Sequence, residues 1–492
     1  MSITNLLSLN FLVPFVASKI DFSNAIRGLA GMPRRLLLIG HKVTAGSVPL
    51  NTRVTVTTEA DAIARFGEGS MLVAMWRAAK ANADLGLPID CIAIAVGNAA
   101  VVATGTIQVG GAATMAGEVM LYIGGVRVST GALPSDTPTT LAAKLVAVIN
   151  ANPKLPVTAA TNGTAGAVVL TANWAGPTGN DIDVRSTFYL DDALPTGVTL
   201  AITAMANGAV APDVSPVITA MSQYRATEIV CPFTDSTNLG ILEAELATRW
   251  LASNMQDGMV VNCVRGTESA VTTFLASRNS PHVHTIAVTK DCTSPWQTAA
   301  MAGAAIESLA AIDPAVPQTG TVLSGYLGPR QGDGFTVDQL GNLLAVGASP
   351  LENYTDFTAG LLRMVTNYTQ TAAGAADRSQ ANVCWLKTMS YYRWFVVTEF
   401  MTKYRGFKLA QYVEEPIPGQ KIMTVPLAEE IMLGIYKLMC DAGLCQNPTY
   451  YQQALVVEID SPNGKLKIVD EPVIVVQHYQ TEVTSQVVAG QV

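Results

Sequence analysis

Residues 259–288, MVVNCVRGTESAVTTFLASRNSPHVHTIAV, contain the pattern that decides the fold of this chain. The apolar run 259–264 predicts a buried strand, the stretch 267–278 predicts a helix, and the β-branched run 282–288 predicts a second strand. Strands that alternate with helices in this way are typical of a mostly parallel sheet with helices packed on it. The sequence therefore predicts an α/β core.

The same alternation fills residues 24–98 and resumes from residue 211, but the region between them differs in composition. Residues 99–210 are rich in Gly, Ala, Thr and Val, have hardly any Lys or Arg, and contain short alternating runs separated by Gly-Gly, Asn-Gly and Pro turns. One predicted helix, residues 138–149, interrupts these runs. Many short strands with turn signals predict a small β-sandwich-like domain. Because α/β segments flank it, we expect it to be an insertion.

Both ends of the chain hold apolar, β-prone runs without an evident partner. Residues 9–16, LNFLVPFV, contain Pro14, and proline is compatible only with an edge strand. Near the other end, Asn463-Gly464 predicts a hairpin turn, and a further strand follows in EPVIVV at 471–476. The predicted fold class is thus α/β (α+β): a core domain with an inserted β-sandwich-like domain and extended N- and C-terminal arms.

The composition favours self-association. Of the 492 residues, 14% are charged, against roughly 25% in an average soluble chain, so we expect much of the surface to meet other chains. The sequence contains no run of roughly 20 largely apolar residues and no signal-peptide pattern, so we expect an intracellular protein and no membrane partner. The net charge is −8 and no basic cluster exceeds Arg34-Arg35, so we expect no nucleic-acid partner. The seven irregularly spaced cysteines predict buried, reduced thiols.

A search for catalytic motifs finds no phosphate loop, no Gly-x-Gly-x-x-Gly after a strand, no His-Glu-x-x-His and no Gly-x-Ser-x-Gly. His282 and His284 would point to one face of a strand and could share a metal ion, but a polar strand face is the commoner meaning of such a pair. The glycine-rich stretch 325–334 could hold an anion, although a surface turn is commoner. We therefore expect no enzyme, no cofactor and no metal site.

Short segments spread along nearly the whole chain resemble, in the same order, those of the contractile tail sheath proteins of Mu-like bacteriophages. They are DFSNA (21–25), FGEGSML (66–72), LPVTA (155–159), GPTGN (176–180), SGYLGPR (324–330), RMVTNYT (363–369) and GQKIMTVP (419–426).

The resemblance implies a structural subunit of a contractile phage tail sheath. Such a subunit would polymerise as stacked hexameric rings around the tail tube, in a metastable extended state, and would contract to drive the tube through the host envelope. The implied partners are further copies of the chain, the tail tube protein, and baseplate and tail terminator proteins. The implied location is the virion tail, after assembly in the host cytoplasm. Two alternatives stay open: the sheath of a tailocin or related injection system, and a cytosolic α/β enzyme with a β insertion.

The resemblance also implies that both arms leave their own subunit and add strands to neighbouring subunits beside the hairpin. The implied bounds are an N-terminal linking arm at 1–23, the first part of the core at 24–98, an inserted outer domain at 99–210, the second part of the core with the hairpin at 211–470, and a C-terminal linking arm at 471–492. The implied intersubunit residues are Leu9, Phe11, Leu12, Val13, Phe15 and Val16 in the N-arm, and Val473, Ile474, Val475, Val476 and His478 in the C-arm. The implied acceptor residues in the hairpin are Leu455, Val457, Ile459, Leu466 and Ile468.

Overall fold

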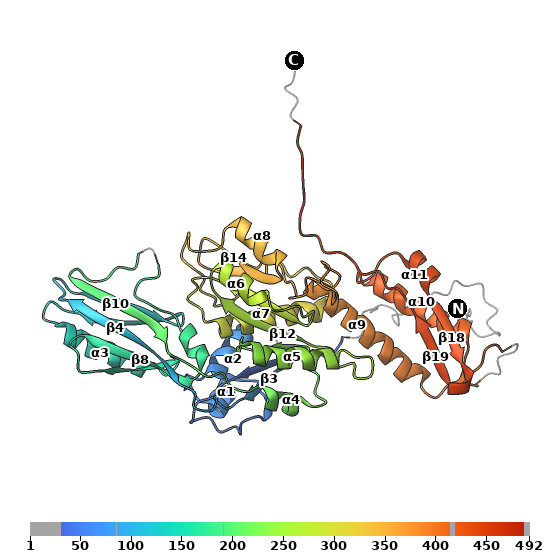
Figure 1. Cartoon of the computed structure of the whole chain (residues 1–492), viewed down its shortest axis with the longest axis horizontal. Helices are drawn as coiled ribbons and strands as arrows, with labels where there is room; N and C mark the ends of the chain where they lie inside the picture. Colours follow the sequence, from blue (N-terminus) through green and yellow to red (C-terminus); the bar gives the residue numbers. More distant parts are fainter. Residues whose placement is uncertain (1–30, 85, 190, 414–418, 487–492) are drawn as a thin grey trace, which may run out of the picture. The chain divides into compact units, whose positions relative to one another are not determined.

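The computed structural model describes residues 31–84, 86–189, 191–413 and 419–486 (Figure 1). The chain forms two compact units. The larger unit lies within Pro33–Trp394 and Val476–Val492, and the smaller unit contains Phe395–Val475.

An eight-stranded sheet forms the centre of the larger unit. Its order is β15-β14-β13-β12-β11-β1-β3-β2. The six inner strands are parallel, and the two edge strands, β2 and β15, are antiparallel to their neighbours. The predicted α/β core is therefore confirmed. The strands are β1 (Leu36–Gly40), β2 (Arg53–Thr55), β3 (Ile89–Ala93), β11 (Glu228–Val230), β12 (Met259–Arg265), β13 (Val283–Val288), β14 (Ala348–Asn353) and β15 (Ala359–Leu361).

Helices cover both faces of this sheet because the inner strands are apolar on both sides. In β1, Leu36 and Leu38 join one core cluster, with residues of α1 (Glu59–Phe66), α2 (Met71–Asn82) and α7 (Pro295–Ile312). The alternate residues Leu37 and Ile39 join a second cluster with α4 (Ser215–Met221) and α5 (Ser236–Arg249). A third cluster packs α6 (Glu268–Leu275) and α8 (Val337–Ala345) against β13 and β14.

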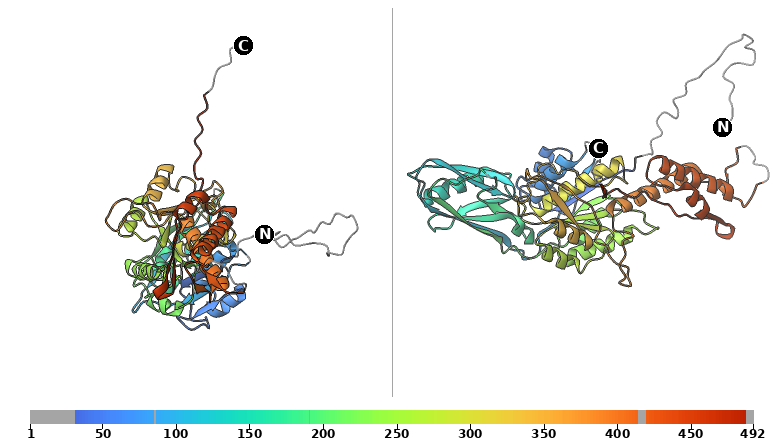
Figure 2. Two further views of the ribbon diagram at one scale, coloured as in Figure 1. Left: turned by 90° about the vertical axis from the view of Figure 1, so that its right-hand side faces the viewer. Right: turned by 90° about the horizontal axis from the view of Figure 1, so that it is seen from above.

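Between β3 and α4 the chain forms two antiparallel sheets, whose strands run side by side in Figure 2. The first, β10-β4-β8-β7, comprises β4 (Val102–Gly111), β7 (Val157–Thr161), β8 (Ala167–Ala175) and β10 (Val198–Ala206). The second, β6-β5-β9, comprises β5 (Gly117–Ile123), β6 (Val126–Ala132) and β9 (Val184–Arg185).

Helix α3 (Pro138–Ala151) packs against both sheets of the insertion. It begins at a capping box in which Thr137 and Thr140 satisfy each other's backbone amides. The inserted region thus contains two sheets and a helix that packs against both. The sandwich-like packing of the sheets and the bounds 99–210 stay predictions.

Helix α9 (Val383–Glu399) starts in the larger unit and continues into the smaller one, where a π-helical turn, Phe400–Tyr404, follows it. In the smaller unit, Tyr436 of α10 and Tyr451 of α11 stack with ring centroids 3.6 Å apart. The sequence placed this region in the second part of the core domain, at 211–470. In the structure it belongs to a separate compact unit. Its remaining elements are β16 (Lys408–Leu409), β17 (Ile422–Met423), α10 (Val425–Asp441), α11 (Pro448–Ala454), β18 (Val456–Asp460) and β19 (Lys465–Val469).

Candidate functional site

Strands β18 and β19 form an antiparallel hairpin in register from Val456↔Val469 to Asp460↔Lys465. Gly464 closes the turn with φ +60°, a conformation that glycine adopts without strain. Ile459 is 4% exposed, whereas Val456 and Val469 are 59% and 63% exposed. The hairpin therefore has one inward and one outward face.

The predicted acceptor residues lie on or next to the inward face. Val457 pairs with Ile468 and Ile459 pairs with Leu466, and β18 contacts α10. Leu455 precedes β18, at the end of α11. Because these side chains point into their own unit, what the hairpin offers to another chain is its backbone edges.

Both edges of the hairpin are open within the described part of the chain, where β18 and β19 pair only with each other. Across the outward face, Glu458 lies opposite Lys467, and Lys467 Nζ lies 3.3 Å from Asp460 Oδ2. Open edges can accept added strands, and charged side chains on an edge limit unspecific pairing.

The C-terminal segment begins with backbone contacts to its own chain. The Gln446 amide donates to the Val473 carbonyl at 2.8 Å, and the Val475 amide donates to the Leu444 carbonyl at 3.1 Å. Ile474 and Cys445 form an antiparallel bridge. The predicted C-arm residues 473–475 therefore lie beside residues 444–446 of the same subunit, and their predicted intersubunit role stays a prediction.

Side chains fix the next part of this segment within the larger unit. Gln477 is 8% exposed; its Oε1 accepts from Trp385 Nε1 at 2.7 Å, and its Nε2 donates to the Ala315 carbonyl at 2.9 Å. The Arg363 guanidinium lies 4.3 Å from the Tyr479 ring centroid. Burial, together with Cys384, raises the pKa of the Tyr479 hydroxyl.

Two further predicted C-arm residues, Val476 and His478, have exposed side chains. The predicted N-arm residues, Leu9, Phe11, Leu12, Val13, Phe15 and Val16, lie outside the described residues. Sequence reasoning missed Gln477 and Trp385, because a polar residue just after a predicted strand gives no sign of a partner 92 positions away.

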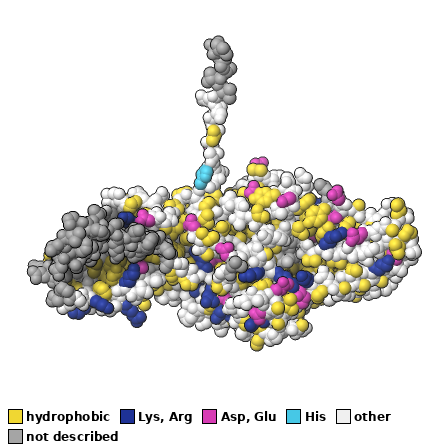
Figure 3. All heavy atoms as spheres, turned by 180° about the vertical axis from the view of Figure 1, so that it is seen from behind, with side chains coloured by type: hydrophobic (Ala, Val, Ile, Leu, Met, Phe, Trp, Pro, Cys, Tyr) yellow, Lys and Arg dark blue, Asp and Glu magenta, His cyan; other side chains and the backbone are white. Residues whose placement is uncertain are grey.

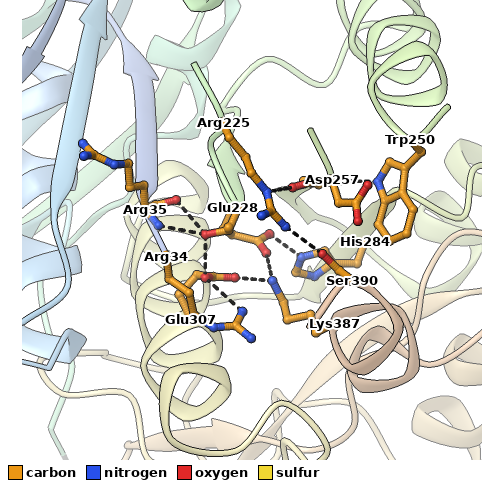
Figure 4. Close-up of polar contacts among 12 residues, drawn as sticks. Arg34, Arg35, Arg225, Glu228, Trp250, Asp257, His284, Glu307, Lys387 and Ser390 are labelled. Atoms are coloured by element: carbon orange, nitrogen blue, oxygen red, sulfur yellow. Dashed lines mark hydrogen bonds and ion pairs between the residues drawn. The ribbon is translucent and has the colours of Figure 1, made fainter. Parts of the chain in front are cut away.

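A buried cluster of charged side chains lies where α9 meets the sheet (Figure 4). Lys387 Nζ donates to Glu228 Oε2 at 2.6 Å and also contacts Glu307. Glu228 contacts His284 Nε2 at 2.6 Å, and Glu307 contacts Arg34 Nη1 at 3.4 Å. The side chains are 0–4% exposed. Two carboxylates, Glu228 and Glu307, therefore face the two cations Lys387 and Arg34.

Electrostatics explains how this cluster stays charged. Burial alone would raise the pKa of Glu307, but the charges of Lys387 and Arg34 lower that pKa below its ordinary value. Burial alone would likewise lower the pKa of Lys387, but Glu228 and Glu307 raise it. The cluster is therefore a packed ionic network that connects α9 to the sheet.

A second polar group holds α9 one to two turns further on. Ser390 Oγ accepts from Arg225 Nη2 at 2.9 Å, and Arg393 Nη1 donates to Asp257 Oδ1 at 2.8 Å. Burial raises the pKa of Asp257, against the lowering effect of Arg393 and Arg225. Together the two groups attach about two turns of α9, from Lys387 to Arg393, to the sheet and to the segments that lead into β11 and β12.

The histidine pair considered for a metal is divided between these two groups. His284 contacts Glu228, whereas His282 stacks on Trp250 with ring centroids 4.8 Å apart. Burial lowers the pKa of His282 to about 4, with a further lowering effect from Arg393. Among the described residues, no group of three or more His, Cys, Asp and Glu side chains has the arrangement of a metal site.

The central sheet also has a crevice of the kind in which many α/β proteins bind ligands. It lies at the carboxyl ends of the strands where the strand order reverses, here between β1 and β11. A cavity of about 410 Å³ lies there, lined by Ala95–Asn98 and Ala211–Asp213, the connections to and from the insertion, and by the start of α5. Asp235 and Asn238 are engaged in capping α5 and in bonding the Pro212 carbonyl. The connections to the insertion thus form one wall of this crevice.

The surface agrees with the low charge of the chain. On the face shown in Figure 3, acidic and basic side chains are interspersed among apolar and other side chains. In the described chain, no helix has the length and apolar character needed to span a bilayer.

Comparison with known proteins identifies the family. No family model matches the chain. The Mu-like prophage FluMu tail sheath protein of Haemophilus influenzae is 32% identical over 452 residues, which are 92% of each chain. Among solved structures, the sheath tail protein of Desulfitobacterium hafniense has 13% identity, covers 94% of this chain and 100% of its own, and gives a TM-score of 0.47. The contracted helical sheath of the anti-feeding prophage has 12% identity, coverage of 96% and 99%, and a TM-score of 0.46. On the strength of the 32% identity over nearly its whole length, the chain belongs to the family of Mu-like phage tail sheath proteins.

Proposed function

We propose that the chain is a non-enzymatic subunit of a contractile phage tail sheath, which forms stacked hexameric rings around a tail tube and contracts to drive the tube through the host envelope. Membership in the tail sheath family supports this role. The structural observation that carries it is the hairpin β18–β19, whose two edges are open in the described chain.

Strand addition explains how such a subunit would polymerise. A hairpin with two open edges has room for two added strands, and the chain has two candidate donors, residues 9–16 and the segment after Tyr479. Main-chain hydrogen bonds would supply affinity, and the apolar inward face would hold the augmented sheet on α10. Each subunit would then be linked to its neighbours by extended chain as well as by surface contact.

Contraction needs no nucleotide in this scheme. The extended sheath would be trapped kinetically and released by the baseplate. Rings would compact and bury additional apolar surface, at about 25 cal/mol per Å². The further partners would be the tail tube, baseplate and tail terminator proteins, with assembly in the host cytoplasm and final location in the virion tail.

Electron microscopy of the purified chain tests the proposal. We expect negative-stain images to show rings or tubes with a central channel. A variant that ends at Tyr479 should stay folded and monomeric, because it keeps the contacts of Val473, Val475, Gln477 and Tyr479 with the rest of the subunit.

A matched pair of point variants separates strand pairing from side-chain effects. Val483 is 79% exposed, so neither Val483→Thr nor Val483→Pro should alter the subunit itself. Threonine keeps β-propensity and should assemble, whereas proline removes a donor and should impair assembly wherever that amide is paired. A sharp monomer peak for the full-length chain at every salt and protein concentration would contradict the sheath proposal and favour a globular enzyme.

A further inference from the structure

We infer that residues 473–479 anchor the C-terminal arm to its own subunit, and that the strand donated to a second copy of the chain begins at Gln480. Donation of that strand rests on the proposed function, whereas the anchor itself is a property of the single subunit. The boundary also narrows the C-arm predicted from the sequence.

The first half of the anchor is a short antiparallel ladder in the smaller unit. Two backbone hydrogen bonds join residues 473–475 to residues 444–446, and the Val473 amide also donates to the Tyr436 hydroxyl at 3.0 Å. Tyr436 is itself 1% exposed and stacked on Tyr451. The arm is therefore attached at its root to a rigid aromatic pair.

The second half of the anchor consists of side-chain contacts of Gln477 and Tyr479 within the larger unit. The Gln477 amide is used at both ends, by the Trp385 indole and by the Ala315 carbonyl, so a truncated side chain would leave both groups without this partner. Tyr479 follows, with its ring under Arg363 and its hydroxyl 3.7 Å from Cys384 Sγ. Contacts from three separate segments therefore hold two alternate residues of the arm.

Beyond Tyr479 the chain changes character. Residues 480–486 are exposed and extended (Figure 1), and no backbone hydrogen bond joins them to another segment within the described chain. Their sequence, QTEVTSQ, alternates Thr481, Val483 and Ser485 with the polar residues 480, 482, 484 and 486, which suits a strand with one face against a partner. Seven extended residues reach at most about 25 Å, so an edge that accepts residues 480–486 must lie within that distance of Tyr479.

The position of the anchor matters for a moving assembly. If the arm were free from residue 471, ring motion would be taken up by loose chain at its root. An anchor that ends at Tyr479 instead keeps the donated strand at a fixed starting point on the subunit, so that movement of the body pulls directly on the neighbour. The unpaired linker between the two subunits is then limited to the few residues between Tyr479 and the paired part of the strand.

Hydrogen–deuterium exchange of the full-length chain, in dissociated and in assembled form, tests this boundary. In the dissociated subunit, we expect peptides covering 472–479 to exchange at least tenfold more slowly than peptides covering 480–486. On assembly, 480–486 should become protected while 472–479 stays unchanged. Gln477→Ala should speed exchange in 472–479, whereas the control Gln480→Ala, one residue beyond the anchor, should not.

The outcomes separate the anchor from the sheath proposal. Fast exchange across 472–479 in the dissociated subunit would overturn the anchor, even if tubes form. A protected 472–479 in a chain that never assembles would support the anchor and refute the proposed function. If 472–479 gains protection only on assembly, the whole segment is donated and the inference is wrong.

Discussion

Replacing Lys387 by Met should destabilise the larger unit more than any exposed charge substitution. The Lys387 side chain is 4% exposed and contacts two carboxylates that are both 0% exposed. Methionine fills much of the same volume, so the main effect is electrostatic. Arg34 still neutralises Glu307, but one buried negative charge, on Glu228, loses its cation. Removing one partner of a buried ion pair costs about 3–5 kcal/mol, and we expect a loss in that range.

Urea unfolding of the dissociated subunit, followed by circular dichroism, measures this loss. The midpoint should fall while the slope stays the same, since the surface exposed on unfolding does not change. The control is Lys290→Met, which removes an ion pair to Asp333 in the same unit. Because the Lys290 side chain is 68% exposed, its loss should change stability by about 1 kcal/mol or less.

A double variant tests whether the loss of stability comes from the unpaired charge on Glu228. In Lys387→Met/Glu228→Gln, the unpaired charge is gone, while Arg34 and Glu307 still form a pair. The double variant should therefore recover at least half of the loss. The charge-balance hypothesis would be refuted if the single variant had a free energy of unfolding within about 1 kcal/mol of wild type. It would also be refuted if the double variant were less stable than the single variant.

Two further predictions concern a buried histidine and the insertion. Burial lowers the pKa of His41 to about 4, partly offset by its hydrogen bond to the Ile94 carbonyl, so its neutral form contributes up to about 3 kcal/mol of stability above pH 6.5 that is lost as the pH falls to 4. Thermal melts between pH 7 and pH 4 should show a shallower decline for His41→Gln than for wild type, and parallel curves would contradict this. Linking Val101 to Ala209 by a short Gly/Ser loop should leave the sheet folded, since these residues already form a bridge, but with a lower melting temperature because Trp296 loses its contact with Trp174. Complete loss of soluble protein would show that the insertion is part of an indivisible core.

The core strands could be predicted because their signal is local. Residues 259–264 and 282–288 are apolar runs, and the structure forms β12 and β13 there with bounds shifted by no more than one residue. Strand β14 gave no such signal: it contains Pro350, and its neighbour β15 has only three residues. Proline is tolerated at that position because the described β14 pairs with β15 only from Leu351 onward.

The site residues were harder to predict because their partners are distant in sequence. Val457, Ile459, Leu466 and Ile468 follow from a two-residue period around one turn, and the structure places all four on one face. Lys387 and Glu228, in contrast, are 159 positions apart, and nothing within either segment indicates the other. The sequence favoured a polar strand face for His284, yet this residue is completely buried, and its Nε2 contacts Glu228 on a nearby strand.

The buried polar contacts of α9 explain how a helix with aromatic residues on several faces adopts one position. Trp385, Tyr391 and Phe395 would allow the helix to slide or rotate while still burying apolar surface. A shift by one residue would, however, move Lys387 away from both carboxylates and Arg393 away from Asp257, leaving buried charges unpaired. A buried ion network contributes little net stability compared with apolar packing, but it penalises every alternative register heavily. Because α9 is also the covalent path from the sheet to the unit that holds the hairpin, fixing its register fixes where that path begins.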